Sequence, residues 1–145
     1  MTLVADVKQR IAAVEGLAKV EEAADLAALI EANQLPERSP SAYVLPLGFN
    51  GGEPDAVSGL YRQRFDQVVA VVLIVKALDD VKARKAIATV DQLEQLLLAR
   101  VCGWAPQEAI GVFRALRGRM VSVAGGVVIY QIDFSLQDQL RITPQ

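Results

Sequence analysis

One run of eight consecutive apolar residues, Val68–Val75, constrains the fold more than any other feature of the chain. The residues before it alternate, with charged Arg62, Arg64 and Asp66 at every second position. Alternation is typical of a strand with one solvated face, whereas a run that is apolar on both sides indicates a strand covered on two faces. We therefore expect a long strand over residues 60–77, with a helix layer on one face and a second layer or another subunit on the other.

Three segments have the three- and four-residue apolar spacing of amphipathic helices. The first covers residues 3–17, with Thr2 as its N-cap, and the second is a short helix over residues 21–32 with acidic residues at its start. The third begins at Asp79-Asp80, continues to about Arg100, and should end at Gly103.

A Gly-rich segment separates two predicted strands. Residues 42–47 have strand-like alternation, and Pro46 indicates an edge position or the end of the strand. Residues 48–59, which read GFNGGEPDAVSG, contain four Gly, one Pro and two acids. Such a composition cannot bury enough surface to order itself, so we expect a mobile loop over 48–59.

The carboxyl-terminal part predicts a hairpin. Gly125-Gly126 is a two-residue turn signal between strand-like segments, and a further strand is expected to begin at Val112. In the resulting register Val121 lies opposite Tyr130. Residues 135–145 are expected to form a tail.

Together these segments predict an α+β fold in a single domain, residues 1–145. We expect an antiparallel or mixed sheet of about four strands, with one long helix packed on it and a shorter N-terminal helical region. The apolar share of 52% is high for a chain of 145 residues. Together with the doubly apolar run, it predicts that the chain associates with copies of itself.

The residue inventory excludes several kinds of chemistry. The chain has no histidine and a single cysteine, Cys102, so a disulfide within the chain, a His-containing zinc site and a Ser-His or Cys-His active site are excluded. Cys102 directly follows a helix C-terminus, where the dipole disfavours a thiolate, so we expect a buried, inert thiol. The acids Asp79 and Asp80 are ordinary for a helix start, and the Gly-rich segment lacks the residues of a phosphate cradle. We expect no catalytic residues, metal or cofactor.

The charge balance and hydropathy restrict the partners. With 15 Lys and Arg against 17 Asp and Glu, the net charge of −2 predicts no tight or sequence-specific binding of nucleic acid. An apolar run of eight residues is too short to cross a bilayer, which needs about 20. The amino terminus lacks the pattern of a secretory signal, so we expect a cytoplasmic protein without a membrane partner.

Two basic clusters, Arg62 with Arg64 and Arg114 with Arg117 and Arg119, allow two interpretations. They are the charges of a solvated edge that prevent aberrant strand pairing, or they form a surface that meets acidic groups of a neighbour or a passing nucleic acid.

The order and spacing of several short motifs resemble the bacteriophage tail-terminator family over residues 3–134. The motifs are Tyr43-Val44-Leu45-Pro46-Leu47, the Gly-rich segment, Arg62-Gln63-Arg64-Phe65 before the apolar run, Gly103-Trp104-Ala105-Pro106 after the long helix, Gly118-Arg119, Gly125-Gly126-Val127, Tyr130 and Phe134.

This resemblance implies a non-enzymatic subunit similar in role to minor tail protein U of long-tailed phages. Such a protein forms a ring, expected to be a hexamer, on the end of the tail tube. The ring stops tube polymerisation and offers a docking face for a head completion protein. The location would be the host cytoplasm during assembly and then the virion tail. Within this resemblance the expected subunit-interface or pore residues are Tyr61, Arg62, Arg64, Arg117, Arg119 and Tyr130.

Three other functions remain open at this point. The chain could be another head-tail adaptor or a tail-tube subunit, of which the latter would form filaments. It could be a small cytoplasmic ligand-binding protein or enzyme that uses carboxylates such as Asp66, Asp79 or Asp133, and that would have a concave apolar pocket. It could also be an oligomeric scaffold of a bacterial host.

Overall fold

The computed structural model describes residues 2–79, 83–106 and 109–145, and its strands form one mixed sheet in the order β1-β2-β3-β5-β4. β1 pairs with β2 in parallel, and the other neighbouring strands pair antiparallel. The α+β prediction is confirmed, with five strands where about four were expected. The elements are α1 (Leu3–Ile11), β1 (Lys19–Glu22), α2 (Ala23–Glu31), β2 (Ser41–Val57), β3 (Leu60–Lys76), α3 (Arg84–Val101), β4 (Phe113–Ala124) and β5 (Val127–Ile142).

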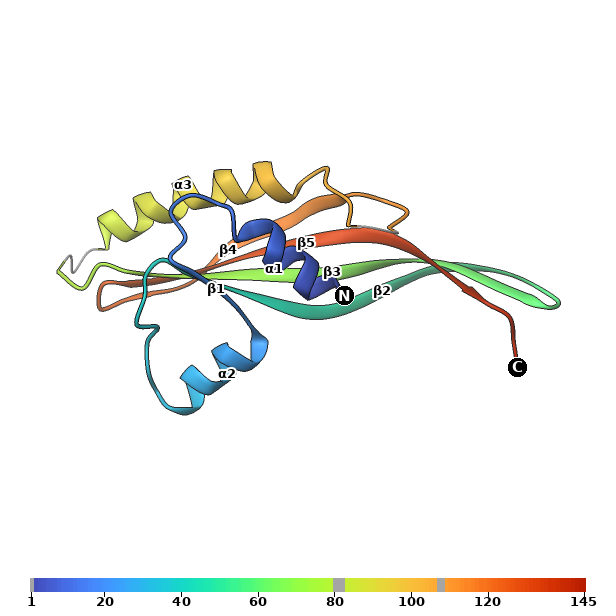
Figure 1. Ribbon diagram of the computed structural model, residues 1–145, viewed down its shortest axis with the longest axis horizontal. Coiled ribbons are helices and arrows are strands. Elements are labelled where there is room, and N and C mark those ends of the chain that lie inside the picture. The colour runs from blue at the N-terminus through green and yellow to red at the C-terminus, as the bar shows by residue number, and fades with distance from the viewer. Residues whose placement is uncertain (1, 80–82, 107–108) are drawn as a thin grey trace.

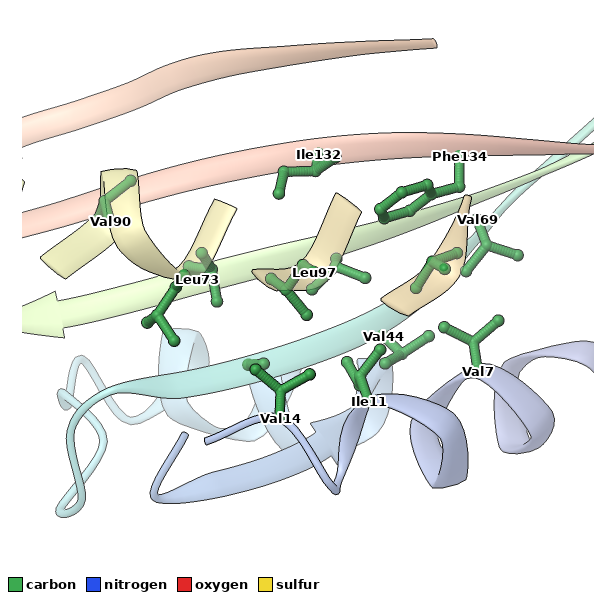
Figure 2. Close-up of a cluster of buried hydrophobic side chains, with 14 of the residues drawn as sticks. Val7, Ile11, Val14, Val44, Val69, Leu73, Val90, Leu97, Ile132 and Phe134 are labelled. Atoms are coloured by element: carbon green, nitrogen blue, oxygen red, sulfur yellow. The ribbon is translucent and has the colours of Figure 1, made fainter. Parts of the chain in front are cut away.

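The main core lies between the sheet and helices α1 and α3, which cover the same face (Figure 1). Val69 and Leu73 of β3 point into this core, where they meet Ile11 of α1, Leu97 of α3 and Phe134 of β5 (Figure 2). All five side chains are at most 2% exposed. Because residues that lie two apart in a strand share one face, the odd-numbered half of the apolar run is buried here.

The opposite face of the sheet is covered in part by α2, which lies on the other side from α1 and α3 (Figure 1). Tyr43 of β2 and the β3 residues Val72 and Ile74 form a second cluster there, against Leu26 and Leu29 of α2. The doubly apolar run predicted that this face would be covered by a second layer or by another subunit, and α2 supplies the second layer.

Of the two alternatives for the second face of the apolar run, the structure shows a layer of the same chain, so the run does not support the predicted self-association. Within one chain, every residue of Val69–Val75 is at most 8% exposed, and Val68 is half-buried. The two helix layers and the flanking strands supply this cover. Any surface for self-association must therefore lie elsewhere.

The loop predicted over residues 48–59 is also wrong. β2 continues to Val57 and pairs with β3 as far as Val57 opposite Leu60, so this segment is most of one strand of a hairpin. The prediction was right that the segment is exposed, but its backbone is ordered by hydrogen bonds to β3 rather than by burial. Register shifts at Pro46/Gly48 and Gly51/Pro54 accommodate its Gly and Pro residues as bulges.

The Gly125-Gly126 turn is confirmed, with positive φ at both residues and Val123 opposite Val128. The predicted pairing of Val121 with Tyr130 is wrong, because a register shift between Met120 and Ser122 places Met120 there instead. β5 extends to Ile142 against β3, so residues 135–142 are strand and not tail.

The helix ends differ from the predictions in detail. Thr2 does cap α1, since its Oγ1 accepts a hydrogen bond from the Ala5 amide, but the helix ends at Ile11 rather than residue 17. α3 begins at Arg84, five residues after Asp79, and Asp80 lies outside the described residues. Gly103 ends the helix with a φ of 82°.

Cys102 is exposed, so the prediction of a buried thiol is wrong. No helix in the described part of the chain has the length and hydropathy to span a membrane.

Candidate assembly surfaces

The hairpin of β2 and β3 extends beyond the helices as an arm, which we define as residues 49–66 (Figure 1). β5 supports it, because residues 137–142 pair with residues 61–66 of β3. The arm is thus a three-stranded end of the sheet that the helices leave uncovered. Every residue of its β2 strand is exposed. Such a surface can offer both backbone and side-chain groups to a partner.

Three of the residues predicted to lie at a subunit interface or pore are on this arm. Arg62 Nη2 lies 2.8 Å from Asp55 Oδ2, which offsets the like charge of Arg141 directly opposite on β5. The Tyr61 hydroxyl donates to Gln63 Oε1 at 2.7 Å. Arg64 is exposed. The arm therefore holds Arg62 and Tyr61 in fixed local contacts, whereas Arg64 faces solvent.

Arg117 of β4 is held by a carboxylate within the same sheet. Its Nε lies 2.9 Å from Asp133 Oδ2, and the Asp133 side chain is 3% exposed while that of Arg117 is 63% exposed. Gln131 Nε2 donates to the other oxygen, Asp133 Oδ1, at 2.8 Å. Arg119 Nη2 reaches Gln131 Oε1 at 3.4 Å. Arg117 thus covers a buried carboxylate, while Arg119 is bound only weakly.

Tyr130 packs against the main core, at the boundary of β5, β4 and α3. A hydrogen bond to Glu94 of α3, followed by burial and the negative charges of Glu94 and Asp91, raises the pKa of Tyr130 to about 12. Gly118 of β4 leaves room for the phenol, because a Cβ there would collide with the Tyr130 side chain. The Tyr130 ring therefore joins α3 to the sheet.

α2 covers only part of its face of the sheet, and the uncovered part of that face is basic. The strand register places six arginines on this face against three aspartates, whereas the whole chain has a net charge of −2. Arg62, Arg64, Arg117 and Arg119 all lie on this face, but the first two are on the arm and the last two on β4. The arginines are Arg62, Arg64, Arg114, Arg117, Arg119 and Arg141, and the aspartates are Asp55, Asp66 and Asp133.

A largely apolar groove of about 820 Å³ lies along the edge of β2. β1 covers this edge only at Ser41–Val44, and beyond that point the edge is open. The first turns of α1 and α2 form two walls, and Phe49 and Val68 line the groove from the sheet. Phe49 is 68% exposed and makes an edge-to-face contact with Phe65 at a centroid distance of 5.9 Å.

Sequence reasoning missed the exposed apolar residues at both edges of the sheet. On β4, Leu116 and Val121 are 41% and 51% exposed, and on β2, Leu47 is 47% exposed. Each of them sits at a register shift, where the neighbouring strand offers it no partner. The positions of bulges depend on tertiary pairing, so no signal in the sequence marks these residues as exposed.

Within the described residues, no group of three or more Cys, Asp or Glu side chains is arranged to hold a metal ion. The carboxylates considered for an enzyme do not converge. Asp133 is bonded to Arg117, Asp79 pairs with Lys85 at 3.5 Å, and Asp66 lies on the arm.

Known proteins resemble this chain in fold and in sequence family. In three dimensions, the chain is similar to a chain from the virion of a native gene transfer agent particle, with a TM-score of 0.55 and 16% sequence identity over 95% of each chain. At this identity the likeness shows a shared fold. No curated protein matches the sequence. The family model described as "Phage tail terminator protein" matches residues 2–144, nearly the whole length. The chain therefore belongs to the phage tail terminator family.

Proposed function

We propose that the chain forms a ring on the end of a phage or phage-like tail tube, stops polymerisation of the tube, and provides the surface to which the head joins. The observation that carries this proposal is the family match over residues 2–144. In this role the protein acts by shape and binding, without catalysis or a cofactor. It binds copies of itself, the tail-tube protein and a head completion protein. It assembles in the host cytoplasm and remains in the virion tail.

The arrangement of the sheet supports a ring. β4 forms one edge, and the open part of β2 forms the other, so a subunit presents two different edges to its neighbours. Contacts between unlike surfaces close into a ring when the rotation between subunits is suitable, and a hexamer is the closed form that we propose. A terminator must also have one face that fits the last ring of the tube and another that does not repeat it.

We assign the contact with the tube or the pore to the arm. It extends past the helices, and it holds Tyr61, Arg62 and Arg64 on an exposed three-stranded end of the sheet (Figure 1). Arg119 is exposed on β4 and is assigned to the contact between subunits. Arg117 and Tyr130 bond within the chain and act at these surfaces indirectly: Arg117 holds β4 to β5 through Asp133, and Tyr130 holds α3 to the sheet through Glu94.

Deletion of the gene from the genome that encodes this chain tests the proposal. Electron micrographs should show tails longer than those of the intact particle, without attached heads, because nothing stops the tube from growing. A plasmid copy of the gene should restore the length and the heads. Tails of normal length in the deletion strain would contradict the proposal. Tails that fail to form at all would instead indicate a tube subunit.

A further inference from the structure

The free edge of β4 is an apolar strip with interspersed arginines. Met120 and Val123 are 43% and 47% exposed, and the bulged residues Leu116 and Val121 are exposed to a similar degree. A bulge leaves the extra residue unpaired, so β5 gives neither Leu116 nor Val121 a partner. We call this surface the β4 strip. Long exposed apolar edge strands are rare in proteins that remain monomeric.

The groove at the open edge of β2 lies on the opposite side of the sheet, since the strand order places β1 and β2 at one edge and β4 at the other. We call it the β2 groove. Its walls are the first turns of α1 and α2, and Pro46, Phe49 and Val68 contribute to its apolar surface. A volume of about 820 Å³ is enough for several apolar side chains.

The charges of the two surfaces are complementary. β4 carries three arginines and no acidic residue. The groove is lined by the two acids Glu22 and Asp25, of which Glu22 already pairs with Lys8 of α1 at 3.5 Å, so the groove keeps a small net negative charge. Opposite charges at the rim of an apolar contact favour the correct partner and the correct register. The same chain therefore contains an apolar basic strip and an apolar acidic groove, at opposite edges of one sheet.

We infer that the β4 strip of one subunit docks in the β2 groove of a second copy of this chain. This inference rests on the proposed ring and adds which two surfaces meet. Each subunit then gives one strip and receives one, which is the heterologous contact that a closed ring needs. The exposed apolar residues of both edges become buried, and Arg114 and Arg119 approach Glu22 and Asp25 of the next subunit.

Two substitutions test the contact from its two sides. Ala24→Arg places a long cation in the groove, on an exposed position of α2, where arginine is a good helix former. Val121→Asp places a charge in the strip at an exposed bulge. The matched controls are Ala27→Arg, on the same helix but outside the groove, and Leu35→Asp, an apolar residue that is 46% exposed and lies outside the groove, the β4 strip and the arm.

Native mass spectrometry of each purified protein gives the first result. The wild type and both controls should form the same closed oligomer, whereas Ala24→Arg and Val121→Asp should each remain at the chain mass of 15.7 kDa. Circular dichroism checks that the variants are folded. If either variant fails to fold, Phe49→Asp replaces the groove variant, or Leu116→Asp the strip variant.

Mixing the two variants gives the sharper result. Ala24→Arg retains an intact strip and Val121→Asp an intact groove, so one working contact forms between them. The mixture should yield a heterodimer of about 31 kDa, twice the chain mass of 15.7 kDa, and nothing larger, because the remaining surfaces are both blocked. A contact between identical surfaces could not produce a species limited to two different subunits.

Three outcomes would overturn the inference. They are variants that assemble like the wild type, a mixture that stays monomeric while the wild type assembles, and a wild type that is monomeric at every concentration. None of these outcomes changes the tail length in the deletion strain, so the proposed function would stand or fall separately.

Discussion

The ion pair between Arg117 and Asp133 gives a prediction that separates a structural role from an interface role. Arg117→Ala leaves the Asp133 carboxylate, which is 3% exposed, with the hydrogen bond from Gln131. A hydrogen bond to a charged group contributes about 1.5–3 kcal/mol. The Arg117 side chain is 63% exposed, so water can replace part of the interaction and the lower end of this range applies.

We therefore expect Arg117→Ala to lower the free energy of unfolding by about 1.5 kcal/mol, with a fall in Tm of about 3–6 °C. Urea denaturation followed by circular dichroism measures the change, and the m-value should stay constant. The control is Arg114→Ala, an exposed arginine on the same strand and the same face, which should change stability by less than about 0.5 kcal/mol. Equal stabilities of the two variants would refute the reasoning.

Repeating the Arg117→Ala substitution in an Asp133→Asn variant isolates the contribution of the Arg117–Asp133 ion pair. In Asp133→Asn the carboxylate charge is gone, so Arg117→Ala should cost much less there than in the wild type. An undiminished loss would mean that Arg117 stabilises the sheet by packing alone. The pair also affects how assembly experiments are interpreted, because charge reversal at Arg117 would weaken β4 before it weakened any contact between subunits.

Three further predictions concern stability. Leu97→Ala removes a fully buried side chain from α3 and should cost about 2–5 kcal/mol in urea denaturation, and a loss below about 1 kcal/mol would contradict the packing of Figure 2. Gly126→Ala should lower the free energy of unfolding by at least about 2 kcal/mol, because a Cβ there would lie 2.5 Å from the Ala77 carbonyl oxygen. At Gly125 a Cβ would face open space, so Gly125→Ala should lower it by only about 1 kcal/mol, from the left-handed backbone conformation. Equal losses of stability in the two variants would show that the turn is placed wrongly. The folded-state pKa of Tyr130, about 12, lies above the ordinary value of 10.0, because of the hydrogen bond to Glu94 first and then burial and nearby negative charge. The stability that the neutral phenol contributes is therefore complete below pH 10 and is lost between pH 10 and 12. Because water screens this partly exposed side chain, the loss should be no more than about 1–2 kcal/mol. Tyr130→Phe should remove this part of the alkaline decline, and an unchanged decline would assign it to other groups.

The parts of the fold that could be predicted are those whose signal is local and strong. The run Val68–Val75 gave a long buried strand, and Gly125-Gly126 gave the turn, since two successive residues with positive φ favour glycine. β1 was missed because its four residues, KVEE, show no apolar alternation and become a strand only by pairing with β2. Residues 48–57 have the composition of a disordered loop, but hydrogen bonds to β3 order them as a strand. The arm was not predicted, because this pairing leaves no signal in the composition.

The candidate surfaces were only partly predictable for a related reason. The sequence identified the basic clusters, and the register shows that they share one face of the sheet. It did not show that Arg117 lies over a buried carboxylate, because Asp133 is 16 residues away and reaches it through the hairpin. It also directed the argument for self-association to the apolar run, whereas the exposed apolar residues of β2 and β4 now carry that argument.

The location of this chain on intact tails tests the proposed function most directly. Electron cryo-microscopy of purified tails, with the protein labelled at a genetically added tag, should show one ring of it at a single end of each tube, next to the head. Label repeated along the whole tube, or absent from both ends, would contradict the account.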